Sequence, residues 1–414
     1  MLSLPAPASE LRRIFERDVG DVLLARSLTP EGLFQSDPPA GSPAGAPPYA
    51  LLVAQGRGIF ALVLAYETLG KPEYREAAAA ASELLLDKGW DPANGGFFWG
   101  FDAAGRVPPD TPFDRHSDKR TLGQAIAALA LAATSRATGD ARYWTGARAT
   151  LELIEEQLAG PKGSYLFDRQ ADYSPRSSGT DLDTLIHVFE TLLGLRGYAP
   201  PSEREPFDAP LMALADFLLE RRSIVPGSGG SRSYVPGHFD AAGRPLLAAT
   251  SDLKGVNNYG HNAELAFLLS RAVEEGLPNA WLEPAETLLR YAVEEALRPD
   301  GQGGAMAFES EVQRKAFDTG RAPLAMWPAL EICRATLHWS VVRGQTEWAE
   351  DGRRVWRTAQ RLFLDSERGG WRESAEVDST QLNPWYGAPY HSAMFLHEAL
   401  RLAEQAPRSR PRDP

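Results

Sequence analysis

The 414-residue chain has one cysteine, no block of basic residues outside its last few positions, and no long apolar run. The lone Cys333 excludes internal disulfides and thiolate metal clusters, and it is compatible with a reducing compartment. A formal net charge of −12 disfavours a surface for phosphate backbones, so nucleic acid is not an expected partner. No stretch approaches the roughly 18 uninterrupted apolar residues of a membrane span, and the start lacks the regions of a signal peptide. We therefore expect a soluble cytoplasmic protein that binds no membrane.

Glycine, in contrast, is frequent and marks an internal repeat. The hexapeptide FDAAGR occurs at 101–106 and again at 239–244. Glycine-led aromatic stretches begin at six positions, spaced by 64, 67, 67, 74 and 66 residues: Gly32, Gly96, Gly163, Gly230, Gly304 and Gly370. Self-similarity at a fixed period is typical of repeat architectures. It also explains the length of the chain, because a single compact core stops growing at about 250 to 300 residues.

Each repeat carries two helical patterns of different character. One is amphipathic and precedes the glycine, as in PEYREAAAAASELLLDKGW, and the other is apolar on nearly all sides, as in RTLGQAIAALALAATSRATG. An all-α toroid suits twelve such helices, because an outer ring of six amphipathic helices can enclose an inner ring of six apolar helices. The glycine-led stretches then form short hairpins at one rim. We predict one α/α catalytic domain over 1–414, with a disordered tail at 406–414.

Polar side chains interrupt the apolar helices near their starts. Six of them lie 21 to 31 residues after the glycine of their repeat: Arg57, Lys119, His187, His261, Trp327 and His391. Equivalent positions on six inner helices converge on the toroid axis, so we predict that these residues line one pocket. The chain has seven histidines. The other four are expected to be structural or surface groups: His116, His238, His338 and His397.

The set favours acid/base chemistry. Two histidines on opposing helices can address opposite faces of one carbon, and an arginine can stabilise an enediolate oxygen. Glutamates follow two of the histidines at i+3, as His187/Glu190 and His261/Glu264, where they can orient the imidazole. A metal site is a weaker alternative, because di-iron bundles use the order Glu-x-x-His.

Six segments of the chain resemble motifs of the N-acylglucosamine 2-epimerase and cellobiose 2-epimerase superfamily, which also contains mannose and related aldose–ketose isomerases. The segments are AQGRGIFAL, NGGFFWGFDAAGR, DLDTLIHVFETLLGL, NNYGHNAELAFLL, MWPALE and WYGAPYHSAM. The similarity runs along nearly the full length. Asp183, Asn262 and Met326 stand where the family commonly has Asn, Asp and Trp, which alters the expected sugar contacts.

This resemblance implies an α/α six-barrel that opens a free reducing sugar, removes the C2 proton and returns it. It gives His261 and His391 as the acid/base pair, with Arg57 and His187 binding the sugar and stabilising the intermediate. It implies no metal and no cofactor. The expected substrate-binding residues are Glu264, Trp327, Trp385, Asp183, Glu190, Glu331, Trp99 and Lys119.

Alternatives remain open from the sequence. An aldose–ketose isomerase would use the same residues, since it differs only in whether C1 or C2 receives the proton. A glycoside hydrolase or lyase on the same toroid would use two carboxylates, for which Asp181 and Asp183 are the candidates. A sugar-binding protein without activity is a third reading. The expected partner is a small-molecule sugar, and a homodimer is a further expectation.

Overall fold

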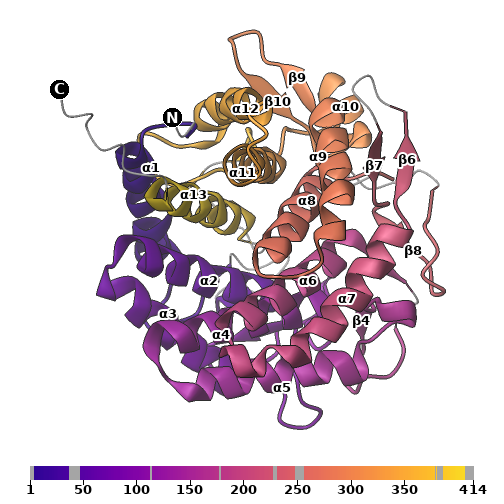
Figure 1. The fold of residues 1–414 in the computed structure, drawn as a ribbon. Coiled ribbons are helices and arrows are strands. Elements are labelled where there is room, and N and C mark those ends of the chain that lie inside the picture. Colours follow the sequence, from indigo (N-terminus) through magenta and orange to yellow (C-terminus); the bar gives the residue numbers. More distant parts are fainter. Residues whose placement is uncertain are drawn as a thin grey trace.

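The inner ring of the toroid is closed in the computed structural model, which describes residues 4–36, 47–111, 114–176, 179–226, 231–247, 256–377, 379 and 386–405. Each inner helix packs against the next, and the last packs back onto the first (Figure 1). In ring order they are α2 (Leu52–Leu69), α4 (Thr121–Thr138), α6 (Leu182–Tyr198), α8 (Tyr259–Glu274), α11 (Trp327–Val342) and α13 (Gly387–Gln405).

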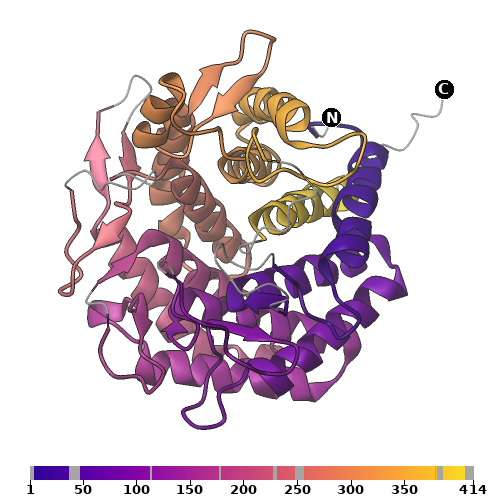
Figure 2. The ribbon, with the colours of Figure 1, turned by 180° about the vertical axis from the view of Figure 1, so that it is seen from behind.

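Six outer helices surround this ring, as both faces of the molecule show (Figures 1 and 2). They are α1 (Ala8–Phe15), α3 (Pro72–Leu84), α5 (Ala141–Gln157), α7 (Glu205–Glu220), α9 (Leu282–Ala296) and α12 (Trp348–Phe363). The ring closes where α1 packs against α13, with an ion pair of 3.1 Å between Arg12 and Glu404. The predicted α/α toroid is confirmed. Sequence reasoning missed one short extra helix, α10 (Glu311–Asp318).

Side-chain size and pattern explain which helices are inside. The middle of α4 is alanine-rich and buried on all sides, so small side chains let it contact both ring neighbours closely. By contrast, α12 buries Val355, Trp356 and Phe363 on one face and carries arginines on the other. The helix α2 is long and apolar enough to cross a membrane, but 78% of that window is buried inside the barrel.

Short antiparallel strand pairs lie in the segments that join the outer and inner helices. β1 (Tyr49–Leu51) pairs with β2 (Gly100–Asp102), β3 (Lys119–Arg120) with β4 (Asp168–Arg169), and β5 (Thr180–Asp181) with β8 (His238–Phe239). β6 (Ser223–Val225) pairs with β7 (Arg232–Tyr234), and β9 (Leu297–Pro299) with β10 (Ala305–Ala307). β1, β3 and β5 each lead directly into an inner helix. They therefore tie successive repeats together at the end of the ring where the inner helices begin.

The repeat glycines mark the turns that follow the outer helices. Gly32, Gly96, Gly163 and Gly370 have φ between 69° and 94°, a region that side chains with a Cβ rarely adopt. In the fifth repeat the positive φ of 80° falls on Gly303 rather than on the predicted Gly304. Gly230 lies outside the described residues, as does the tail 406–414.

Amide side chains near the starts of inner helices hold the glycine-led segments in place. The Gln55 side chain accepts from the Phe34 backbone N–H at 2.9 Å, and the Gln124 side chain accepts from Phe97 at 3.0 Å. Asn262 accepts from Val235 in the same way, at 2.8 Å. Each amide also donates to a backbone carbonyl, so both kinds of buried backbone group are satisfied. These contacts fix the rim relative to the inner helices.

Candidate active site

The structure brings five of the six predicted pocket residues together where the inner helices begin. Arg57 on α2, His187 on α6, His261 on α8 and His391 on α13 are between 1% and 7% exposed. Trp327, the first residue of α11, is half-buried and contacts two of these histidines. Four inner helices thus supply titratable or cationic groups to one buried cluster, as the repeat predicts.

His187 is held between two carboxylates. Its Nε2 lies 3.4 Å from Asp183 Oδ1, and its Nδ1 lies 3.3 Å from Glu190 Oε2, as the i+3 spacing predicts. Burial disfavours the charged ring, but these two contacts outweigh it and raise the pKa of His187 to about 10. Arg57 Nη2 approaches the same Nε2 at 3.3 Å. Both carboxylates contact the His187 ring, and the Arg57 guanidinium lies beside that ring.

His391 has the opposite electrostatic setting. Burial lowers the pKa of His391, and Arg57 and His187 act in the same direction, whereas Glu331 opposes them. The ring is therefore neutral near pH 7. Its Nδ1 lies 2.7 Å from Glu331 Oε1. A neutral imidazole that donates through Nδ1 carries its lone pair on Nε2, so the geometry makes Nε2 of His391 a proton acceptor.

His261 opens α8 beside a tryptophan ring. Asn258 caps this helix, because its side chain accepts from the His261 backbone N–H at 2.8 Å. The His261 and Trp327 rings lie 4.6 Å apart between centroids, at 33°. Asp183 Oδ1 lies 3.5 Å from His261 Nε2, so one carboxylate contacts both His187 and His261.

Trp327 contacts both histidines of the predicted acid/base pair. Its ring is 4.6 Å from that of His261 and 5.7 Å from that of His391, with interplanar angles of 33° and 35°. The close approach to α8 requires a glycine, because a Cβ on Gly260 would meet the indole at 2.4 Å.

A buried arginine, Arg334, lies beneath this cluster. Its Nη2 lies 2.6 Å from Glu331 Oε2 and 3.5 Å from Glu264 Oε1, and its Nη1 lies 4.0 Å from Glu190 Oε1. Glu190 and Glu331 are the carboxylates that contact His187 and His391. One guanidinium, 2% exposed, thus links the partners of both histidines from a position deeper in the barrel.

The predicted pairing of Glu264 with His261 is wrong. Neither carboxylate oxygen of Glu264 has a hydrogen-bond partner among the described residues, and its nearest ion-pair partner is Arg334. Burial and the neighbouring Glu331 raise the pKa of Glu264 well above its usual value. The i+3 spacing places Glu264 on the axis-facing side of α8, below His261 rather than beside it.

Lys119 does not join the cluster. It lies on β3, before the first turn of α4, and its fully buried ammonium forms a 2.9 Å ion pair with Asp91. Counting residues from the repeat glycine placed it level with the histidines, but a strand directs its side chain differently from a helix. The ammonium holds the loop after α3 and supplies no charge to the pocket.

Of the other two predicted tryptophans, Trp99 departs from expectation. Trp99 is fully buried, with Nε1 donating to Asp114 at 2.9 Å and the Arg120 guanidinium 4.4 Å from its ring centre. Its ring is therefore covered and cannot stack on a sugar. Trp385 lies outside the described residues.

The ligand atoms of His187, Glu190 and Glu264 lie within 4.8 Å of one another, a grouping that has the donors of a metal site. The same carboxylates face the Arg334 guanidinium at 3.5 and 4.0 Å. The protein thus places its own cation where a metal would have to enter. These residues do not fit a metal centre. That the protein binds no metal remains a prediction.

The chain is similar to known proteins over most of its length. Residues 39–394 match the N-acylglucosamine 2-epimerase (GlcNAc 2-epimerase) family. The chain belongs to this family. A cellobiose 2-epimerase from Bacteroides fragilis is 23% identical over 370 residues, covering 84% of this chain and 86% of the relative. The structure of cellobiose 2-epimerase from Bacillus thermoamylovorans B4167 superposes with a TM-score of 0.77 at 18% identity, over 95% and 98% of the two chains. The structure of a D-mannose isomerase superposes with a TM-score of 0.75 at 19% identity, over 95% of this chain and 97% of that one.

In this member of the N-acylglucosamine 2-epimerase family, two further side chains border the cluster. The Tyr390 hydroxyl donates to Glu190 at 2.5 Å, and its ring lies 4.9 Å from the Arg57 guanidinium carbon. Glu373 accepts from the Ala388 backbone N–H at 2.8 Å near the start of α13. Tyr390 is adjacent to His391 in the sequence, which is the signal that could have identified it. No local pattern identifies Glu373 or Arg334.

Proposed function

We propose that the protein is a carbohydrate 2-epimerase acting on a free reducing sugar. The observation that carries this proposal is the pair of imidazoles, His261 and His391, which both contact Trp327 and lie near the cations of Arg57 and His187. Family membership supports the same chemistry. We also propose that the chain acts as one catalytic domain.

The proposed reaction moves one proton and keeps its electrons in the sugar. After ring opening, a neutral histidine takes the C2 proton, and the electron pair of the C–H bond passes to the carbonyl oxygen as an enediolate. The other histidine, protonated, returns a proton to C2 from the opposite face, which inverts the centre. Nε2 of His391 is the nitrogen placed for this transfer, because Nδ1 is bound to Glu331.

The developing oxygen charge needs fixed cations, which contribute more in a site that excludes water. Arg57 and His187 supply two of them 3.3 Å apart, and the raised pKa of His187 keeps its ring charged at pH 7. Asp183 and Glu190 hold the His187 ring in place. We expect Trp327 to carry the apolar face of the sugar, and Glu190 and Glu331 to orient the histidines rather than to bind the sugar.

An aldose–ketose isomerase is the second candidate, favoured by the fold shared with a D-mannose isomerase. It would protonate C1 in place of C2. A hydrolase is disfavoured, because Asp181 caps α6 by accepting from Thr184 at 2.9 Å and Asp183 contacts both His187 and His261. A cytoplasmic location and a homodimer remain predictions.

Product analysis separates these candidates. The protein is incubated with glucose, mannose, fructose, N-acetylmannosamine and cellobiose, and the products are identified by chromatography and NMR. A C2 epimer as first product supports the epimerase, and a ketose supports the isomerase. Cleavage of cellobiose that persists in His391→Ala and disappears in Asp183→Ala would show a hydrolase instead.

A further inference from the structure

The end of the barrel where the inner helices finish contains a cavity of about 830 Å³. It lies at the mouth opposite the histidines and is lined by residues from all six inner helices. Cavities that hold small molecules commonly measure 300 to 1,000 Å³, so this one has ligand size. Nothing in the proposed epimerase chemistry uses it.

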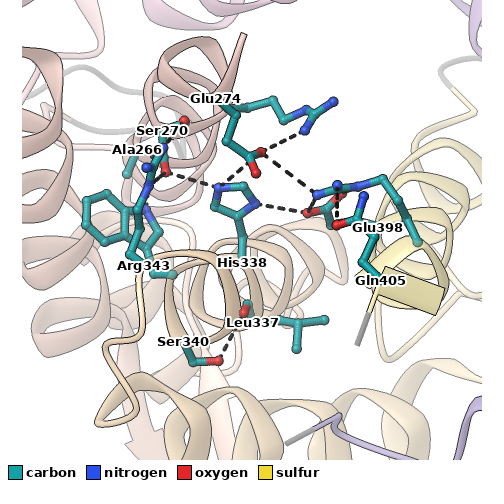
Figure 3. A network of polar contacts seen from close by, with 12 residues as sticks. Ala266, Ser270, Glu274, Leu337, His338, Ser340, Arg343, Glu398 and Gln405 are labelled. Carbon is teal, nitrogen blue, oxygen red and sulfur yellow. Dashed lines mark hydrogen bonds and ion pairs between the residues drawn. The ribbon is translucent and has the colours of Figure 1, made fainter. Parts of the chain in front are cut away.

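Glu398 and Arg401, which line this cavity, belong to a network of polar contacts centred on His338 (Figure 3). His338 Nδ1 lies 2.9 Å from Glu398, and its Nε2 lies 3.0 Å from the Ser270 hydroxyl. The Arg401 guanidinium donates twice to Glu398, at 2.7 Å each. These contacts connect α8, α11 and α13, and they leave Glu398 and Arg401 little capacity for a ligand.

The opposite wall carries polar groups that make few hydrogen bonds. Arg204 donates through Nε to the Ala199 carbonyl at 3.3 Å, and the described part of the chain gives it no ion pair. Glu275 Oε2 is buried without a hydrogen-bond partner, with Arg196 3.9 Å from it and Arg271 3.4 Å from Oε1 of the same carboxylate. Arg136 approaches Glu67 only at 3.6 Å. A donor fork and an unsatisfied acceptor thus face the same cavity.

The charge balance at this mouth favours a neutral ligand over an anion. Four arginines line it in addition to Arg334, and the carboxylates of Glu67, Glu190, Glu275 and Glu398 line it with them, so the two signs of charge nearly balance. The inner helices also end here and add the partial negative charge of their last carbonyls. A hydroxyl group suits both walls, because it donates to a carboxylate and accepts from a guanidinium.

Apolar side chains complete the lining. Phe267, Leu268 and Met394 line the cavity together with Tyr66 and Tyr198. These give the C–H faces of a sugar ring or polyol a surface to pack against. The floor consists of Glu190 and Arg334, which also contact the residues around His187 and His391.

We propose that this second mouth binds a neutral polyhydroxylated compound, a sugar or sugar alcohol, at a site separate from the catalytic histidines. Arg204 and Glu275 are the recognising pair. The proposal goes beyond the epimerase function, because the compound need not have a carbonyl group or react.

The five methionines of the chain offer a site-resolved test. Met394 lines the second mouth, and Met326 caps α11 beside Trp327 at the catalytic end. Protein labelled with ¹³C at the methionine methyl groups is titrated with methyl α-glucoside, sorbitol and glucose 6-phosphate and observed by NMR. Methyl α-glucoside has a locked ring, so it cannot be enolised. Met394→Leu and Met326→Leu assign the two signals.

We expect methyl α-glucoside or sorbitol to shift the Met394 signal with saturation, also in His391→Ala. The double variant Arg204→Gln/Glu275→Gln should weaken this binding about tenfold or more, since it removes hydrogen bonds to charged groups. Arg136→Gln provides a second variant at the rim. The matched control Arg148→Gln/Glu152→Gln removes an exposed i,i+4 ion pair on α5 and should leave binding unchanged.

Three results would overturn the proposal. They are a Met394 signal that stays unmoved, one that moves only with glucose 6-phosphate, and one whose shift disappears in His391→Ala because it is transmitted from the catalytic end. If no sugar is epimerised but Met394 still responds, the catalytic proposal fails and this one stands.

Discussion

Replacing Glu331 by glutamine tests how the structure tunes His391. The side chain keeps its shape and loses the charge that contacts Nδ1 at 2.7 Å. A hydrogen bond to a charged group contributes about 1.5 to 3 kcal/mol, and this contact strengthens as His391 accepts the C2 proton. We therefore expect kcat/KM to fall by about one to two orders of magnitude.

The pH profile gives the direction of the effect. Glu331 opposes the lowering of the His391 pKa by burial, so its removal lowers that pKa further. The acid limb of kcat/KM, which reports the free enzyme's base, should then move to lower pH while the plateau falls. Rates are measured from pH 4 to 9 by the appearance of the epimeric sugar.

A matched control exists in the same barrel. Glu398 contacts Nδ1 of His338 at 2.9 Å, in a second carboxylate–imidazole pair at the opposite mouth. Glu398→Gln should lower the melting temperature and leave the acid limb in place. If Glu331→Gln keeps the wild-type profile, or if Glu398→Gln shifts the limb equally, then Glu331 does not tune a catalytic His391.

Three further predictions concern stability. Gly260→Ala drives a Cβ into Trp327 and should destabilise the fold by about 1 to 3 kcal/mol in urea unfolding; an unchanged midpoint would contradict the tight packing. Arg334→Met leaves buried carboxylates without their cation and should lower the free energy of unfolding by about 3 to 5 kcal/mol. The double variant Arg334→Met/Glu264→Gln should recover part of this loss. If the effects of the two substitutions on the free energy of unfolding simply add, the two residues are not coupled. The folded-state pKa of His187, about 10, lies above its unfolded value of 6.5, so its stabilisation is complete below pH 6.5 and is lost as the pH rises through 10. Melting temperatures should fall over that interval, and His187→Gln should flatten the curve; a parallel curve would argue against a charged His187.

The repeat in the sequence predicts the toroid well because the burial of apolar helices requires such an arrangement. Helices apolar on all sides must be enclosed, and six of them at a fixed period close into a ring. The same period predicts that four side chains lie at the same end of the inner ring: Arg57, His187, His261 and His391. Lys119 deviates because a two-residue strand precedes α4, and residue counting cannot distinguish strand from helix.

Contacts between distant residues are the part that sequence reasoning could not supply. Glu331 and His391 lie 60 residues apart on neighbouring inner helices, so no local spacing reveals their pairing. The i+3 rule succeeds for His187 and Glu190 and fails for Glu264, since the side on which a residue meets its neighbour depends on how each helix is rotated. In the sequence, Arg334 is a single charge in an apolar helix. The structure shows that three glutamates surround it.

Deuterium exchange at C2 tests the central claim most directly. A reducing sugar that the protein converts is incubated with it in D2O, and the label is located by NMR in wild type, His261→Ala and His391→Ala. We predict deuterium at C2 with the wild type and loss of exchange by at least about 10²-fold in each variant. Conversion without deuterium at C2 or C1, or exchange that survives both substitutions, would contradict the account.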